Sequence, residues 1–165
     1  MEHSHTKQEF LSAYDMYADA IFRHCFFKVS DREVARDITQ DVFTKTWQYL
    51  SDNKPVLNMK AFLYKVAGNL VIDYYRKRKT DSLDLKIDEG VQFASEEVMG
   101  GQNAEIGIVI EALQKLPENY REVMRLRYVD DLTPGEIAEI TGQSENAVSV
   151  KIHRGLEKLK HILHI

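Results

Sequence analysis

The sequence predicts an all-α protein in which two small helical domains are joined by a flexible acidic linker. Apolar residues recur at spacings of three and four through most of its 165 residues, which is the period of an amphipathic helix. Residues 80–104 break this period and contain three glycines and six acidic side chains. Residues that favour helix N-caps precede most of the periodic stretches. These observations divide the chain into a first domain over residues 1–79, a linker over 80–104 and a second domain over 105–165.

Three helices are expected in the first domain, over about residues 6–29, 31–50 and 59–79. Each begins at a residue whose side chain can cap a helix, and these caps are Thr6, Ser30 and Asn58. In the first two helices a glutamate stands three residues after the cap, which completes a capping box. The broad apolar stripe of the first helix consists of Phe10, Tyr14, Tyr17, Ala18, Ile21, Phe22 and Cys25.

The second helix carries two apolar stripes. The expected core face consists of Ala35, Ile38, Val42 and Tyr49. Phe43 and Trp47 lie about a quarter-turn away from that face. Either the core face of this small domain is wide, or Phe43 and Trp47 form a surface patch for a partner protein, where such residues are typical anchors. The periodicity favours neither interpretation.

The third helix ends in four consecutive cations, at residues 76–79. Its inward stripe is predicted to contain Phe62, Leu63, Val66, Ala67, Leu70 and Tyr74, and the residues predicted to lie elsewhere include Lys60, Tyr64, Asn69, Asp73 and Arg76. The cations complement the negative end of the helix dipole, and this structural role is one interpretation. Cations beside Tyr64, Tyr74 and Tyr75 are also typical of sites that hold single-stranded nucleic acid.

The second domain is expected to contain four helices, of which the last two form a helix-turn-helix. One helix begins after residue 103 and ends before Pro117, and another covers about residues 117–128. Thr133, Pro134 and Glu136 then begin a short helix. Gly142 ends it in a left-handed conformation, and Ala138 and Gly142 supply small residues where the helices touch.

Ser144 caps the final helix, whose buried stripe contains Val148, Ile152, Leu156, Leu159 and Leu163. An ordinary helical hairpin would show the same periodicity. DNA binding is favoured because the outward face begins with short polar residues suited to base edges and continues with cations suited to phosphates.

The composition of the chain excludes several classes of function. Hydrophobic residues make up 44% of the chain and charged residues 29%, as in ordinary globular proteins. No apolar run approaches the roughly 20 residues that span a bilayer, and the N-terminus lacks the pattern of a signal peptide, so a cytoplasmic protein without membrane insertion is expected. Cys25 is the single cysteine and is expected in the core. No enzyme, cofactor or metal site is expected, because the sequence has no glycine-rich phosphate loop and its six histidines do not gather with carboxylates.

The net charge of −4 is unusual for a DNA-binding protein, and its distribution is uneven. Cations and anions number 13 and 10 in residues 1–79, 1 and 6 in 80–104, and 8 and 10 in 105–165. The acidity is therefore concentrated in the linker.

Three ordered segments carry a family resemblance: DREVARDITQDVFTKTW at 31–47, NMKAFLYKVAGNLVIDYYRKRK at 58–79 and LPENYREVMRLRYVDDLTPGEIAEITGQSENAVSVKIHRGLEKL at 116–159. In this order and spacing, the chain resembles a bacterial sigma factor of the extracytoplasmic-function (ECF) class of the sigma-70 family. The resemblance implies that residues 1–79 are sigma region 2 and residues 105–165 sigma region 4. It implies a factor that binds core RNA polymerase and directs it to specific promoters.

The resemblance also implies three sets of site residues. Docking on the β′ clamp of polymerase would involve Asp37, Gln40, Asp41, Phe43 and Trp47. Opening and capture of the minus-10 element would involve Lys60, Tyr64, Lys65, Asn69, Asp73, Tyr74, Arg76 and Lys77. Reading of the minus-35 element would involve Arg127, Glu145, Asn146, Ser149, Val150, Lys151, His153 and Arg154. Ser149 and Val150 stand where many relatives carry a basic residue, which implies weaker attraction to phosphates.

The partners implied by the resemblance are core RNA polymerase, through its β′ clamp and β flap, promoter DNA and an anti-sigma factor. A monomer is expected in the free state, because the chain shows no heptad or separate dimerisation segment, whereas the rival helix-turn-helix regulators usually bind symmetric sites as dimers. The acidic residues of the linker have two possible roles. They either occupy the nucleic-acid channel of polymerase as an RNA mimic or only keep the linker solvated. These residues are Asp81, Asp84, Asp88, Glu89, Glu96 and Glu97.

Overall fold

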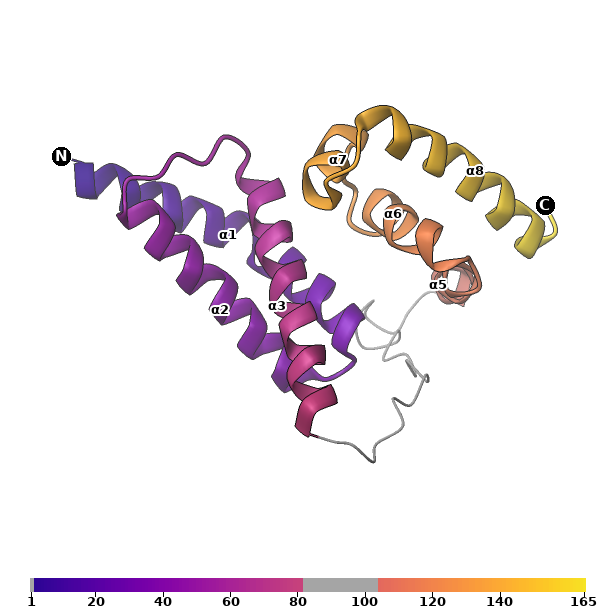
Figure 1. Cartoon of the computed structure of the whole chain (residues 1–165), viewed down its shortest axis with the longest axis horizontal. Coiled ribbons are helices and arrows are strands. Elements are labelled where there is room, and N and C mark those ends of the chain that lie inside the picture. The colour runs from indigo at the N-terminus through magenta and orange to yellow at the C-terminus, as the bar shows by residue number, and fades with distance from the viewer. Residues whose placement is uncertain (1, 82–103) are drawn as a thin grey trace. The chain divides into compact units, whose positions relative to one another are not determined.

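The computed structural model describes residues 2–81 and 104–165. Within these residues the chain is helical, in the order α1, α2, α3, α5, α6, α7, α8 (Figure 1). It divides into two compact units, Met1–Ala94 and Ser95–Ile165. The prediction of an all-α protein with two small domains is confirmed. The predicted linker lies outside the described residues except at its two ends. Thr80 and Asp81 still belong to α3, where the Thr80 hydroxyl donates to the Arg76 carbonyl at 2.7 Å, and Ala104 begins α5.

The first unit consists of α1 (Glu2–Val29), α2 (Arg32–Ser51) and α3 (Met59–Asp81). A two-residue connection makes α1 and α2 antiparallel, and α3 packs against both (Figure 1). Cys25 is fully buried in this core, as predicted. The other buried apolar residues of the unit are Ala13, Ile21, Phe26, Val29, Ala35, Ile38, Val42, Phe43, Leu50, Ala61, Leu63, Tyr64, Ala67 and Val71.

The predicted start of α1 and the predicted cap of α2 are wrong. α1 begins at Glu2, ahead of the expected cap Thr6, because the intervening residues include no glycine or proline that would stop a helix. α2 is capped by Asp31, whose carboxylate accepts from the amides of Glu33 and Val34 at 3.0 and 3.1 Å. Ser30 is unable to serve as this cap because it ends α1 in a left-handed conformation (φ 56°). The cap of α3 is the predicted one, since the Asn58 side chain accepts from the Ala61 amide at 3.0 Å.

The buried face of α3 differs from the predicted stripe. The residues that are buried are Ala61, Leu63, Tyr64, Ala67 and Val71, whereas Phe62, Val66, Leu70 and Tyr74 are only half-buried. The periodicity of this segment was ambiguous because apolar residues surround the helix. Packing against two helices selects a face that the pattern on one helix does not specify.

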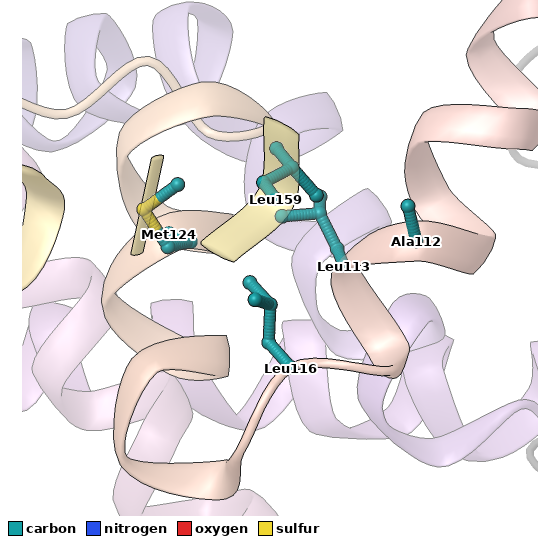
Figure 2. Close-up of a cluster of buried hydrophobic side chains, with 5 residues drawn as sticks. All are labelled: Ala112, Leu113, Leu116, Met124 and Leu159. Atoms are coloured by element: carbon teal, nitrogen blue, oxygen red, sulfur yellow. The ribbon is translucent and has the colours of Figure 1, made fainter. Parts of the chain in front are cut away.

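The second unit consists of α5 (Ala104–Gln114), α6 (Glu118–Tyr128), α7 (Pro134–Thr141) and α8 (Glu145–Leu163). The prediction of four helices ending in a helix-turn-helix is confirmed. Figure 2 shows how side chains from α5, from the α5–α6 connection and from α6 and α8 converge in one cluster of Ala112, Leu113, Leu116, Met124 and Leu159. Because α8 packs on α5, α6 and α7, this cluster fixes the helix that carries the candidate DNA-reading residues.

α8 packs closely against Met124 of α6 at Gly155, a contact that was not predicted from the sequence. A Cβ atom on Gly155 would lie 2.7 Å from the sulfur of Met124 and 2.8 Å from its Cγ. Gly142 was expected to provide such a contact, but a Cβ there would meet nothing within 4 Å. Glycine is needed at position 142 for its backbone conformation instead, because its φ of 72° lies in the left-handed region.

Candidate nucleic-acid and partner interfaces

The helix-turn-helix is stabilised by the helix caps that the sequence predicts. The amide of Glu136 donates to the Thr133 hydroxyl at 3.2 Å, and the Thr133 amide donates to the Glu136 carboxylate at 3.1 Å, which completes a capping box. At the other end of α7 the Gly142 amide donates to the Ala138 carbonyl at 2.9 Å. The Ser144 hydroxyl then accepts from the Ala147 amide at 3.1 Å and starts α8.

α8 presents a polar face opposite its buried residues. Val148, Gly155 and Leu159 are buried against the rest of the unit. The predicted DNA-reading residues of α8 that are exposed are Glu145, Asn146, Ser149, Val150, His153 and Arg154, and Lys151 is half-buried. His153 lies 3.7 Å from the carboxylate of Glu157 one turn later. The structure therefore brings most of the predicted minus-35 residues onto one helix surface.

Glu145 and Arg127 make contacts within the second unit. The carboxylate of Glu145 lies near the start of α7, with Oε2 3.8 Å from the position that a Cβ of Gly135 would take. The guanidinium of Arg127 donates to the Leu132 carbonyl at 3.2 Å and lies 3.8 Å from the Asp131 carboxylate. The Arg127 side chain thus supports the connection between α6 and α7.

The α3 candidates divide between core and surface. The placement of Tyr64 outside the core was wrong: its side chain is 1% exposed, and its ring packs edge-on against buried His24, with centroids 4.9 Å apart. An aromatic ring at this position is taken up by the core because α3 contacts α1 there. The remaining candidates are accessible, with Lys65, Asn69, Asp73, Arg76 and Lys77 exposed and Lys60 and Tyr74 half-buried.

Tyr75 anchors the basic half of α3. Its hydroxyl donates to the Lys28 carbonyl near the end of α1, and its ring lies 5.3 Å from that of Tyr74. Arg76 lies 3.9 Å from Asp73, and both side chains are exposed. The result is a helix surface on which exposed cations stand beside a pair of aromatic rings.

Phe43 and Trp47 differ in burial, and the wide-core interpretation is confirmed for Phe43 alone. Phe43 is buried, whereas Trp47 is 40% exposed. The ring of Phe10 on α1 lies edge-on to Trp47 at 5.2 Å and to Phe43 at 6.3 Å. Together these helices form an open groove of about 760 Å³, lined by Lys7, Phe10, Leu11, Tyr14, Gln40, Phe43, Thr44 and Trp47.

We name this the α1–α2 groove. Its α2 side was predicted from the sequence, but its α1 side was not, because Phe10 and Tyr14 fit the core stripe of α1 equally well. Asp37 and Asp41, the remaining predicted docking residues, are exposed on α2.

Two kinds of feature are absent from the part of the chain that the structure describes. Across residues 2–81 and 104–165, no helix combines the length and the apolarity needed to cross a membrane. Within the same described ranges, no three side chains of histidine, cysteine, aspartate or glutamate gather in a way that could hold a metal ion.

Comparison with known proteins accounts for both units. The family model of Sigma-70 region 2 matches residues 13–80, and that of Sigma-70, region 4 matches residues 106–159. The chain is 32% identical to the ECF RNA polymerase sigma factor SigW of Bacillus subtilis over 162 residues, covering 92% of this chain and 87% of SigW. It is 30% identical to the RNA polymerase sigma factor SigV of the same organism, covering 84% and 81% of the two chains.

Solved structures share the fold at low identity. The sigma factor RpoE in complex with the anti-sigma factor NepR from Bartonella quintana has a TM-score of 0.70 and 20% identity, covering 96% of this chain and 98% of RpoE. CnrH in complex with the cytosolic domain of CnrY has a TM-score of 0.64 and 24% identity, covering 96% and 89%.

Proposed function

Because this chain belongs to the sigma-70 family as an ECF sigma factor with regions 2 and 4, we propose that its two units divide promoter recognition between them. A sigma factor directs core RNA polymerase to promoters and catalyses no reaction itself. Region 2 docks on the β′ clamp and opens the minus-10 element, while region 4 contacts the β flap and reads the minus-35 element. The observation that carries this proposal is that the first unit presents two exposed surfaces and the second unit presents one, each suited to its task.

The surface for polymerase is the exposed face of α2 together with the α1–α2 groove. Trp47 supplies a partly exposed indole at the rim of an apolar groove, which is the kind of anchor that dominates protein interfaces. Asp37, Gln40 and Asp41 are exposed on the same helix and supply polar contacts around it. Phe43 supports the groove from the core.

The surface for the minus-10 element is the exposed side of α3. Arg76 and Lys77 attract phosphates, and the neighbouring Tyr74 offers a ring on which an unpaired base can stack. Lys60, Lys65, Asn69 and Asp73 complete this surface. Tyr64 supports it from within, since its ring is buried against His24.

The surface for the minus-35 element is the outward face of α8. Asn146, Ser149 and Val150 face base edges in the major groove, and Lys151, His153 and Arg154 face base edges or phosphates. Glu145 stands exposed at the start of α8, and Arg127, which supports the connection before α7, remains accessible to a phosphate.

Regulation by an anti-sigma factor is part of the proposal. Its support is that the similar structures of RpoE and CnrH were solved as complexes, RpoE with an anti-sigma factor. We place the protein in the cytoplasm, where polymerase and promoters are found, as a monomer in its free state. The acidic residues between the units act either as an RNA mimic in the polymerase channel or as a solvated connection.

The test is run-off transcription with core RNA polymerase, with and without the chain, on a pool of promoter fragments from the source genome. We expect specific start sites only when the chain is present. Trp47→Ala should lower affinity for core polymerase, whereas Arg154→Ala should leave that affinity unchanged and reduce initiation only at promoters with an intact minus-35 element. If the chain neither associates with core polymerase nor starts transcription, the proposal is wrong.

A further inference from the structure

An exposed apolar side chain stands in the middle of the polar face of α8. Val150 is 39% exposed and follows buried Val148 by two residues. Two residues correspond to about 200° around a helix, so Val150 points almost directly away from the core of the unit. Its place on the helix is therefore not explained by the buried face of α8.

The neighbours of Val150 on that face are polar. Asn146 and Arg154 lie one turn before and after it, and His153 is three residues further on. These are the residues that the proposed function places toward the major groove. Between Asn146 and Arg154 of α8, Val150 is therefore the one exposed apolar residue, because Ala147 and Ile152 are half-buried and Val148 is buried.

We propose that Val150 determines specificity at the minus-35 element by contacting the 5-methyl group of a thymine. This inference rests on the proposed function and names the base that one residue of it reads. Thymine is the base that offers a methyl group in the major groove, and apolar side chains recognise it by packing against that methyl. Valine suits the task because its branched side chain has few rotamers, so the two methyl groups are held in place.

The experiment removes the methyl group and nothing else. Once run-off transcription has located the minus-35 element, each thymine in either strand of it is replaced singly by deoxyuridine. The normal and substituted templates, made with different run-off lengths, compete in one tube for holoenzyme assembled from core polymerase and the full chain. We expect one thymine at which the normal template is preferred about fourfold, the effect of burying one methyl group.

Three variants assign that preference to a residue. Val150→Ala should abolish the preference, and Val150→Ile, which keeps a branched apolar side chain, should retain it. Val109→Ala is the matched control, because Val109 is also a valine with 39% exposure but lies on α5; it should leave the preference unchanged. Both alanine substitutions occur at exposed helix positions, where alanine favours the helix.

Several results would overturn the inference. It fails if no thymine in the element shows a preference, if the element contains no thymine, or if the preference persists with Val150→Ala. It also fails if Val150→Ala weakens association with core polymerase and affects both templates equally, since Val150 would then contact protein. The absence of any start site with the wild-type chain would instead contradict the proposed function, and this inference with it.

Discussion

The contact between Gly155 and Met124 makes a clear prediction for a single methyl group. Gly155→Ala should lower the free energy of unfolding of the second unit, because the added Cβ would lie within 3 Å of two atoms of Met124, which is fully buried. Overpacking of this kind costs about 1–3 kcal/mol, which outweighs the gain of roughly 0.5–1 kcal/mol from replacing a helical glycine. The measurement is hydrogen exchange of α8 peptides in the full chain.

Gly68→Ala is the matched control for this prediction. Gly68 also lies inside a helix, but a Cβ there meets nothing within 4 Å. The first unit should therefore gain stability by the same roughly 0.5–1 kcal/mol. In a Met124→Ala background, Gly155→Ala should no longer lower the free energy of unfolding, because the side chain that the added Cβ would clash with has been removed. Equal effects of Gly155→Ala in both backgrounds would contradict the contact.

At the scale of residues, the sequence indicates which side chains are candidates for function. It predicts less well how buried each of them is and what it contacts. Tyr64 and Phe43 are buried although periodicity or resemblance placed them toward partners. Arg127 was expected to meet a phosphate, and it also binds the Leu132 carbonyl. Such contacts depend on where a neighbouring helix or loop lies, and this information is not present in the spacing of residues along one helix.

At the scale of elements, the capping box of α7 should be essential to the short helix that it begins. α7 has eight residues, so one lost cap affects a large share of its hydrogen bonds. Thr133→Ala should cost about 1 kcal/mol, because the hydroxyl that accepts from the Glu136 amide is removed. The expected result is faster hydrogen exchange in α7 peptides of the full chain.

Thr141→Ala is the control within the same helix. The Thr141 hydroxyl donates to the Ile137 carbonyl at 2.8 Å, a bond back into the helix that adds little stability. Since alanine has the better helix propensity, this variant should exchange no faster than the wild type. Equal acceleration by both variants would show that the cap is not what holds α7.

The α1–α2 groove predicts that α1 contributes to polymerase binding. Leu11 is exposed and lines the groove, so Leu11→Ser should weaken binding to core polymerase by about fivefold, equivalent to about 1 kcal/mol of lost apolar contact. Met16→Ser is matched to it, since Met16 is an exposed apolar residue of α1 that does not line the groove. Binding can be measured by fluorescence anisotropy of the labelled chain. If Met16→Ser weakens binding as much as Leu11→Ser, the groove is not the docking surface.

The helices themselves were largely predictable from sequence. Their first residues were predictable where the capping side chain depends only on the residues next to it. Thr133, Ser144 and Asn58 cap the helices that they were expected to cap. The cap of α2 was misassigned because Ser30 and Asp31 are adjacent and both suit the position. The conformation of Ser30 is decided by the end of α1, which a pattern for the start of α2 does not include.

At the scale of the whole molecule, charge limits what the chain can do alone. The net charge is −4, and residues 105–165, which carry the helix-turn-helix, contain 8 cations and 10 anions. Non-specific attraction to DNA comes from phosphate neutralisation by clustered cations, and this unit has no excess of them. The local cations of α8 must therefore act together with contacts made elsewhere.

The last prediction is that the free chain binds a promoter duplex poorly and gains specificity when joined to core polymerase. Its dissociation constant should be weaker than about 10 μM at physiological salt, in the range of non-specific binding. Polymerase would hold both units on one promoter, where two linked weak contacts strengthen each other by about 10² to 10⁴ through effective concentration. Anisotropy of a labelled duplex, titrated with the chain and then with holoenzyme, measures both states. A duplex with a scrambled minus-35 element serves as the control, and nanomolar binding of the free chain to the intact duplex alone would show that region 4 is a self-sufficient DNA-binding domain.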